Sequence, residues 1–469
     1  MRFERNSEGN FGRNFEGSGG AGRRAFLLCL LISLAISMAA VAVFDRQNAK
    51  DSLLDLTNLV GPTVAGLLHG RGLTACTVLL GTPGNPICFH GGRMPIPTLV
   101  VAMGVRLVGD HFVPVALLKT LLLLIPLEGA MYFACLRLRF QPRRRGWLTL
   151  VLLLAPFGMT AFLADVVNLQ VEEGYSYGFL ALATAVVLFR GGRGGWLRRD
   201  GLGEAAVLGA AVAGLYLSKS SMALAAAVLT VAYLVRARGT RVRWVAVVLA
   251  MAAPVGWAAY QHHATGRASL GTSIDGFNLR KGNDAIFLLR YPPPPGDTLD
   301  RYDSELNAGV HFSDEWSFND FHQRAAVEFL RTHPGATARG EVRKLEMIFF
   351  SVRKFGSSAS HGALLGMEVA GMVIFRLLMW AALGMSLAAV LREWRGMRGD
   401  GVIFLLLVSA VALPYVLGFA YTRHVSVLIY PAVLMCCRVL EGPGSRSPGS
   451  GERGWESTLR ESRLRVSRF

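Results

Sequence analysis

The sequence predicts an all-α integral membrane protein, a bundle of about ten transmembrane helices with amphipathic helices on the extracytoplasmic side. Of its 469 residues, 52% are hydrophobic and only 17% are charged, and the mean hydropathy is +0.39. A soluble chain of this length would need more charge to solvate its surface, so we expect much of the surface to face lipid. Apolar stretches recur along the chain, and the connectors between them alternate in charge, as an oriented bundle requires.

The chain begins with a polar, Gly- and Asn-rich segment, residues 1–24, which predicts a disordered cytoplasmic N-terminus. The apolar stretch 25–44 follows; at about 1.5 Å per residue it can cross a bilayer core of roughly 30 Å. A cleaved signal peptide is the alternative for this stretch, since Ala39 and Ala40 would suit a cleavage site. Further apolar stretches predict the remaining spans, at 113–136, 147–164, 176–189, 203–217, 221–235, 244–260, 367–391, 402–420 and 425–440.

Basic residues gather in alternate short connectors. The basic connectors contain Arg137, Arg139, Arg143, Arg144 and Arg145, then Arg190, Arg193, Arg198 and Arg199, then Arg236, Arg238, Arg241 and Arg243, and finally Arg392, Arg395 and Arg398. The connectors between them carry only Lys219 and Arg423 as basic residues. The positive-inside rule therefore predicts that both termini are cytoplasmic and that residues 45–112 and 261–365 are extracytoplasmic. Most of the net charge of +17 is a topology signal, so we expect no nucleic-acid partner.

This organisation predicts one membrane domain, 25–440, with two outer loops, 45–112 and 261–365, and a disordered basic cytoplasmic tail, 441–469. The six cysteines show no CxxC pair, and no zinc-like cluster of His and Cys occurs. Cys76 and Cys88 both lie in the first outer loop. We expect two lone thiols there, with a disulfide as the alternative if that side of the membrane is oxidising.

The first outer loop has several short elements. The half-apolar segment 59–68 is followed by a glycine-marked turn at 70–73, a turn-rich run at 81–86 and a short apolar helix at about 98–108. Paired carboxylates, a histidine and an arginine between two spans predict a reaction site at the membrane surface, and a decorated loop is the alternative. In the second outer loop, Pro292–Pro295 predicts a rigid spacer.

A helix is predicted in the second outer loop. The capping-box pattern Ser317-Phe-Asn-Asp320 marks its start. Phe321, Ala325 and Phe329 then share one helical face, and Pro334 ends the helix. That face could lie on the bilayer or pack on the bundle. Within the spans, Lys119, Glu128 and Arg376 are expected to face the bundle interior or one another, because charges in lipid are costly.

The seventh span ends in a sequence with a specific resemblance. From Trp257 to Asn283 it is similar to a pattern of the bacterial family 39/83 type of polytopic GT-C glycosyltransferases, which includes lipid A aminoarabinose transferases and Rgt-type sugar transferases, with protein mannosyltransferases as distant relatives. The matching residues are Gly266, Thr272, Gly276, Asn278, Leu279, Gly282 and Asn283. The family's Arg-Asn pair is replaced by Gln261-His262.

Other segments resemble this family in the same order along residues 25–440. They are Leu67-Leu-His-Gly-Arg-Gly-Leu73, Arg93-Met-Pro-Ile-Pro-Thr-Leu99, Glu172-Glu-Gly-Tyr-Ser-Tyr177, Ala326-Val-Glu-Phe-Leu-Arg-Thr-His-Pro334 with Lys344, and Arg423-His-Val-Ser-Val-Leu-Ile-Tyr-Pro431. The resemblance implies transfer of a sugar from a polyprenyl-phosphate donor to a glycan, glycolipid or protein acceptor outside the bacterial cytoplasmic (inner) membrane, with inversion at the anomeric carbon. It also implies contact with membrane lipids.

Such a reaction needs a carboxylate to take the acceptor's proton. Asp55 is the first candidate and Asp51 the second, both just outside the first span. The family has an aromatic residue near this position, and this sequence lacks it. The alternative for both is an aspartate at a helix start or in solvent.

The resemblance and the charge pattern also suggest substrate-binding residues. Arg423 is the first choice for the donor phosphate, with Lys219 and Lys344 next, while Arg93 and His90 could contact donor or acceptor. Glu172 and Glu173 could bind sugar hydroxyls or hold a divalent cation, although on a helix only one of two adjacent residues should point into the cleft. No other cofactor is assigned and no metal ligand set is predicted. The alternative for Arg423 is an arginine that extends to the membrane interface. For Glu172 and Glu173 it is a solvated turn, and for Arg93 and His90 it is a structural role.

Two rival functions fit parts of the pattern. Spans with internal charges suit a transporter or flippase of lipid-linked saccharides, but the two large outer loops break any two-half symmetry. A non-catalytic relative that kept the fold would explain the missing aromatic residue and the replaced Arg-Asn pair.

Overall fold

The computed structural model describes residues 59–79, 81–82, 86–137, 172–190, 201–237, 239–286, 299–352, 363–391 and 397–440, with scattered positions between 27 and 39. The predicted disordered ends lie outside these ranges, as do the span at 147–164, the proline run and both Asp51 and Asp55. The first predicted span, 25–44, is described only at those scattered positions.

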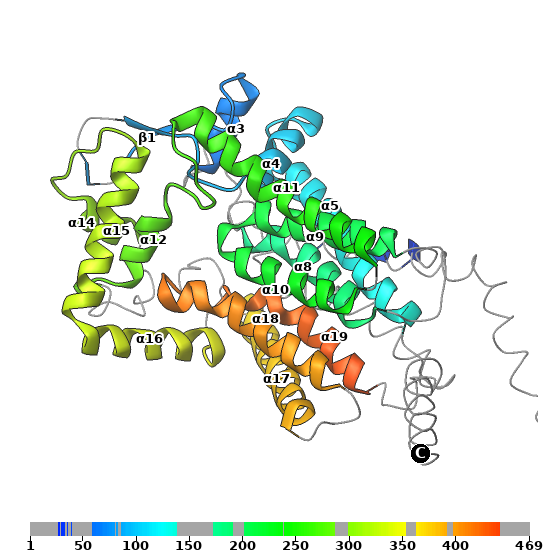
Figure 1. The fold of residues 1–469 in the computed structure, drawn as a ribbon. Coiled ribbons are helices and arrows are strands. Elements are labelled where there is room, and N and C mark those ends of the chain that lie inside the picture. Colours follow the sequence, from blue (N-terminus) through cyan, green and yellow to red (C-terminus); the bar gives the residue numbers. More distant parts are fainter. Residues whose placement is uncertain are drawn as a thin grey trace, which may run out of the picture.

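The described chain is mostly helical (Figure 1). Its helices are α3 Val60–Leu68, α4 Pro95–Val108, α5 Phe112–Arg137, α8 Glu173–Leu188, α9 Leu202–Ser218, α10 Ala223–Arg236, α11 Thr240–Thr265, α12 Asp275–Gly282, α14 Leu299–Asn307, α15 Glu315–Thr332, α16 Pro334–Phe349, α17 Ala363–Leu391, α18 Arg398–Leu417 and α19 Ile429–Leu440. Two short 3-10 helices, η3 Ser220–Met222 and η5 Ser426–Leu428, precede α10 and α19. The antiparallel strands β1 Ala75–Val78 and β2 Pro86–Phe89 depart from the predicted all-α class.

The predicted spans that fall on fully described residues coincide with α5, α8, α9, α10, α11, α17, α18 and α19. By length and composition, four of these helices, α5, α11, α17 and α18, could cross a membrane, whereas α8, α9, α10 and α19 are shorter apolar helices. The class of helical membrane protein is therefore supported, and the number of ten spans stays a prediction.

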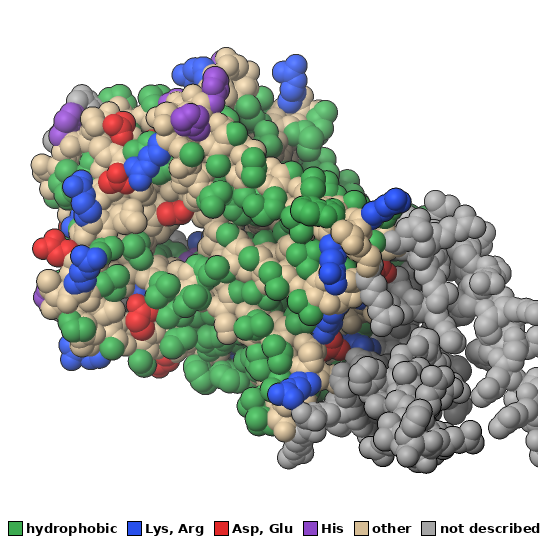
Figure 2. All heavy atoms as spheres, viewed as in Figure 1, with side chains coloured by type: hydrophobic (Ala, Val, Ile, Leu, Met, Phe, Trp, Pro, Cys, Tyr) green, Lys and Arg blue, Asp and Glu red, His purple; other side chains and the backbone are tan. Residues whose placement is uncertain are grey.

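Helix α11 shows why these apolar sequences pack as a bundle. Its small residues Ala246, Ala250 and Ala253 recur at helical spacing and are buried, so neighbouring backbones can approach closely. The opposite face exposes Trp244 and Val248 at 62% and 59%. A continuous exposed apolar face on a helix long enough to cross a membrane is typical of a surface that contacts lipid. In Figure 2, hydrophobic side chains spread over the side of the bundle.

Several basic residues meet at one end of the bundle. Helix α8 runs from Glu173 toward Arg190, and α9 returns from Glu204 toward Lys219. At the Arg190 end, Arg190 lies 3.8 Å from Glu204, and Asp400 contacts Arg236 at 2.5 Å and Arg438 at 3.1 Å. The helix ends that lead into three of the basic connectors thus share one end of the bundle, as the topology prediction requires. Which side of the membrane this end faces stays a prediction.

The first outer loop contains the predicted glycine-marked turn at 70–73 and a hairpin that was not predicted, while residues 83–85 of the predicted turn-rich run lie outside the described residues. Gly70 and Gly72 have φ of +76° and +71°, the left-handed conformation that favours glycine. Strands β1 and β2 pair Cys76 opposite Cys88, and the two form a disulfide. The expectation of two lone thiols was therefore wrong, because an antiparallel register brings together two side chains that are distant in sequence. The apolar helix predicted at 98–108 begins at Pro95, which suits the first helical position.

In the second outer loop, α12, α14 and α15 lie beside one another at one side of the bundle, and α16 runs from the end of α15 toward α18 (Figure 1). Helix α15 begins at Glu315, earlier than predicted, because Asp314 is its N-cap. Ser317, the third residue of the helix, completes the capping box with Asp314. Its buried face is formed by Phe318, His322 and Ala326 rather than by the predicted stripe of 321, 325 and 329. The helix ends at Thr332, and Pro334 then opens α16.

The core of this outer part surrounds His322. Its Nδ1 faces Arg280 at 3.2 Å, and arginine can only donate, so Nε2 carries the proton and donates to Asn307 Oδ1 at 3.0 Å. Four phenylalanine rings contact the imidazole: Phe277, Phe312, Phe318 and Phe321. Burial, aided by the charge of Arg280, lowers the pKa of His322 to about 3.

This histidine makes a specific contribution to acid sensitivity. The unfolded chain binds a proton on this side chain below its ordinary pKa of 6.5, and the folded chain does so only near 3. Stability should therefore be complete above about pH 6.5 and fall as the pH drops, by about 2 kcal/mol at pH 5. The variant His322→Gln keeps a donor toward Asn307 and should remove this part of the decline, measured by denaturant unfolding between pH 7 and 5. An unchanged pH slope in the variant would contradict the assignment.

The charged residues predicted within spans are buried. Lys119 and Glu128 are fully shielded, and Lys119 Nζ lies 4.4 Å from the centre of the Tyr175 ring. Arg376 donates to the carbonyl oxygens of Ser351 and Thr422, at 3.2 and 3.0 Å. The prediction that these side chains face the bundle interior is confirmed, and their polar groups are held away from lipid.

Candidate functional site

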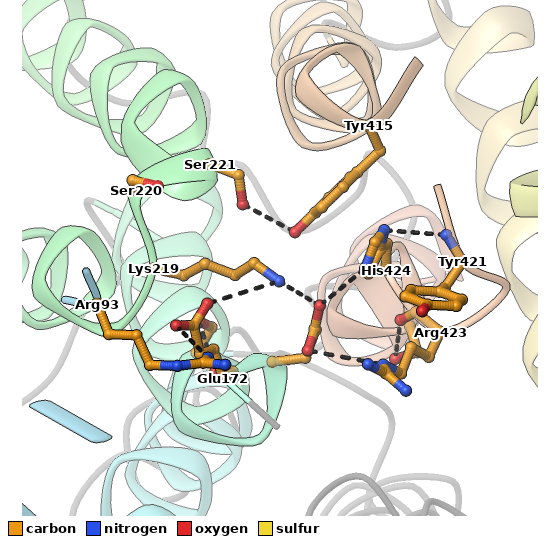
Figure 3. A network of polar contacts seen from close by, with 12 residues as sticks. Arg93, Glu172, Lys219, Ser220, Ser221, Tyr415, Tyr421, Arg423 and His424 are labelled. Carbon is orange, nitrogen blue, oxygen red and sulfur yellow. Dashed lines mark hydrogen bonds and ion pairs between the residues drawn. The ribbon is translucent and has the colours of Figure 1, made fainter. Parts of the chain in front are cut away.

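Five residues that the sequence analysis selected meet at one end of the bundle (Figure 3). They come from separate parts of the chain: Arg93 precedes α4, Glu172 and Glu173 open α8, Lys219 joins α9 to η3, and Arg423 lies between α18 and η5. We call this group, with His424, the cation cluster. It lies at the end of the bundle opposite the basic connectors, because α8 and α9 run from one end to the other.

Glu173 is the centre of the cation cluster. Its side chain is only 2% exposed, and its carboxylate accepts a hydrogen bond from Lys219 Nζ. The other contacts are with His424 Nε2 at 3.4 Å and Arg423 Nε at 3.9 Å. A buried carboxylate is stable only when such partners replace its lost hydration. Glu173 is therefore committed to holding these groups in place.

Glu172 forms the more open half of the cluster. Its carboxylate accepts from Arg93 Nη1 at 2.9 Å and lies 3.9 Å from Lys219 Nζ. Both adjacent glutamates reach Lys219, Glu172 from the more open side and Glu173 from the buried side, and which of them faces a substrate stays a prediction. Side chains at the start of a helix lean toward its N-terminus, and Lys219 lies beyond that terminus. The positive end of the helix dipole also favours both carboxylates.

The pKa values of Lys219 and His424 are shifted in opposite directions. Burial would lower the pKa of Lys219, but the Glu173 carboxylate, with Tyr415 and Glu172, outweighs it and raises this pKa above its usual value. Burial lowers the pKa of His424 well below its usual value, and nearby Lys219 and Arg423 act in the same direction against Glu173. His424 is therefore neutral at physiological pH, whereas Lys219 is a cation.

The tautomer of His424 follows from its contacts. The backbone N–H of Tyr421 donates to His424 Nδ1 at 3.0 Å, so the proton of the neutral ring is on Nε2, which faces Glu173. The imidazole also stacks on the Tyr415 ring, with centroids 4.1 Å apart. Arg423 lies over the ring of Tyr421 at 4.6 Å. The loop that contains Arg423 is thus fixed from both sides.

Several residues at this site were missed by the sequence analysis. Tyr415 shares a hydrogen bond of 2.8 Å with Ser221, and Ser220 donates to Asp275 at 3.2 Å. Burial raises the pKa of Asp275, although hydrogen bonds from Thr272 oppose the shift. His424 and Ser220 could have been found as sequence neighbours of Arg423 and Lys219. Tyr415 and Asp275 had no local signal, because their role depends on helix packing.

The remaining predicted site residues are elsewhere or outside the described chain. The Nδ1 atom of His90 shares a hydrogen bond of 2.9 Å with the Thr74 hydroxyl. The backbone N–H of His90 donates to the Glu315 carboxylate at 3.0 Å. Lys344 is fully buried in α16 and donates to Asn283 Oδ1 and the Val416 carbonyl. It also donates to Glu341 Oε1 at 3.3 Å, and these contacts with residues of α16 and α18 and with Asn283 favour a structural role.

Two further observations bear on the candidate site. Among the described residues, no group of three or more His, Cys, Asp or Glu side chains is arranged to hold a metal ion. Comparison of the chain with protein-family models, with curated proteins and with solved structures gives no match.

Proposed function

We propose that the chain is an integral membrane glycosyltransferase that moves a sugar from a polyprenyl-phosphate donor to an acceptor on the extracytoplasmic face. The ordered resemblance to GT-C enzymes suggests the reaction class. The acceptor class is a cell-envelope glycan, glycolipid or protein, and the enzyme acts in the bacterial cytoplasmic (inner) membrane. The cation cluster supports this proposal, because it has what a lipid-linked phosphate would need.

One observation carries the proposal: three cations from three distant segments surround two glutamates at the end of an apolar bundle. Arg93, Lys219 and Arg423 exceed the two carboxylates by one positive charge, since His424 is neutral. Arg423 is 31% exposed and Glu173 only 2%, so an approaching ligand meets the guanidinium first. A monoanionic phosphodiester would meet several cationic hydrogen-bond donors at this site.

The proposed roles follow from the chemistry. The acceptor oxygen bonds to the anomeric carbon while the bond from that carbon to the phosphate oxygen breaks, and the electron pair leaves with the phosphate. The cations stabilise this growing charge, and the fork of Arg423 suits phosphate oxygens. Glu172, the more exposed carboxylate of the cluster, is the group assigned to the sugar hydroxyls. Asp55, outside the described residues, takes the acceptor's proton.

A transfer assay tests this function. Purified protein in lipid nanodiscs is given a radiolabelled polyprenyl-phosphate sugar together with an envelope extract from a deletion strain. We expect label to leave the donor and appear in one product, identified by mass spectrometry as the species that the deletion strain lacks. In vesicles, movement of intact donor across the bilayer without a new glycosidic bond would instead indicate a flippase and contradict the proposal.

A further inference from the structure

Residues 272–283, which we call the bridging segment, contact all three chain segments that carry the cations of the cluster. The segment consists of α12 and the residues on either side of it. We infer that it sets the spacing of Arg93, Lys219 and Arg423, and that Ser273, Asp275 and Asn283 are positioning residues for the donor phosphate. This inference rests on the proposed function of the cation cluster.

The first contact is with the segment that leads to Arg93. The backbone N–H of Ser273 donates to the carbonyl of Gly91 at 2.9 Å, two residues before Arg93. Ser273 Oγ and the Gly91 N–H both donate to the buried carboxylate of Glu315, at 2.5 and 3.1 Å. The backbone near Arg93 is therefore held closely against the bridging segment.

The second contact is with the segment of Lys219. Asp275 Oδ1 accepts from Ser220 Oγ at 3.2 Å, and Ser220 directly follows Lys219. Thr272 donates twice to the same carboxylate, from its backbone N–H and from its hydroxyl, at 2.7 Å each. Asp275 is thus fixed within its own turn, and one hydrogen bond connects it to the start of η3. Lys219 lies at this junction between α9 and η3.

The third contact is with the segment that leads to Arg423. Asn283 Nδ2 donates to the Leu417 carbonyl, at the end of α18, at 2.6 Å. Gly282 packs on Gly418 so closely that a Cβ would lie 1.8 Å from its carbonyl oxygen. Lys344 strengthens this contact by donating to Asn283 Oδ1 at 3.2 Å and to the Val416 carbonyl at 2.9 Å. The turn that carries Arg423 therefore begins from a fixed point.

The bridging segment is stiff enough to set these distances. Its helix α12 has eight residues, a length of about 12 Å, and separates Asp275 from Asn283. It is anchored on α15 through Gly276 N–H, which donates to Asn319 Oδ1 at 2.8 Å, and through the Phe277 and Phe318 rings, 5.2 Å apart. A phosphate needs its cations within a few tenths of an ångström of one arrangement, so displacement of either end should weaken binding.

The test is a set of double-substitution cycles on the affinity of the full-length protein in detergent for farnesyl phosphate. Ser220→Ala removes only the hydrogen bond to Asp275 and should weaken binding about three- to tenfold. In the Lys219→Met background the same change should alter affinity by less than about twofold, because its effect passes through that lysine. In the Arg423→Gln background it should keep its full effect. Asn283→Asp removes the donor to the Leu417 carbonyl. It should keep its full effect on affinity in the Lys219→Met background and alter affinity by less than about twofold in the Arg423→Gln background.

Controls separate positioning from stability. Ser220→Thr keeps the hydroxyl and should keep the affinity, and Ser409→Ala removes a hydroxyl from the exposed face of α18 and should change nothing. Equal losses in every background, or no loss in Ser220→Ala, would overturn the inference while leaving the phosphate site intact. If Lys219→Met and Arg423→Gln do not themselves weaken binding, the proposed function is wrong and the inference is lost with it. Should Asn283→Asp fail to fold, the Ser220 cycles alone decide.

Discussion

Sugar transfer is expected to fall about 10²–10⁴-fold when Asp55 is changed to asparagine, the usual size of a general-base contribution. Asparagine keeps the shape of the side chain and loses only its ability to accept the proton of the attacking hydroxyl. Donor affinity should change by less than about twofold, since the phosphate is bound by the cation cluster. The measurement is a single-turnover rate with saturating radiolabelled donor, alongside farnesyl phosphate binding.

The neighbouring acid provides the control for this prediction. Asp51→Asn makes the same chemical change four residues earlier, and we expect it to keep transfer within about threefold of wild type. A large loss in Asp51→Asn alone would move the base to that residue. If both variants transferred sugar at the wild-type rate, proton removal from this segment would be excluded and the proposed mechanism would be wrong.

The second large effect is on stability. Changing Glu173 to glutamine removes a buried carboxylate and leaves the largely buried Lys219 without its main partner, a kind of change that typically costs about 3–5 kcal/mol. The neutral amide cannot stabilise two cations. Its N–H group would also face the N–H donors of Lys219 and Arg423, which need an acceptor. Denaturant unfolding in detergent, followed by tryptophan fluorescence, should show this loss.

Glu172 is the matched control, because it is the adjacent carboxylate and contacts the same lysine. Its side chain is 17% exposed, so water and salt can replace part of its interaction. We expect Glu172→Gln to lower the free energy of unfolding by about 1 kcal/mol or less. Equal losses for the two variants would contradict the assignment of Glu173 as the buried centre.

The sequence predicted much of the fold because apolar stretches and arginine-rich connectors are local features. The helices α5, α11, α17 and α18 fall where hydropathy placed spans. The hairpin was missed because its strands have only four residues each, and the Cys76–Cys88 disulfide depends on their register. The start of α15 was misplaced because two overlapping capping patterns lie side by side, and only the structure shows that Asp314 is the cap.

The candidate site was predicted unevenly for the same physical reason. Arg93, Glu172, Glu173, Lys219 and Arg423 were selected from short motifs and from the scarcity of charge at one end of the bundle, and the structure brings them together. Lys344 was selected by the same reasoning but contacts a different set of residues, because a motif does not show which way a side chain is buried. Asp275 and Tyr415 join the site only through packing of distant elements. The site's substrates and both candidate bases stay predictions.

The most direct test of the cation cluster compares farnesyl phosphate with farnesol, which has the same tail and no charge. The wild-type protein should bind the phosphate at least about tenfold more tightly, and this preference should weaken as salt increases. Lys219→Met should remove most of the preference and leave farnesol binding unchanged. Equal affinity of the wild-type protein for the two compounds, or a preference that survives loss of Lys219, would contradict the claim that this cluster receives a lipid-linked phosphate.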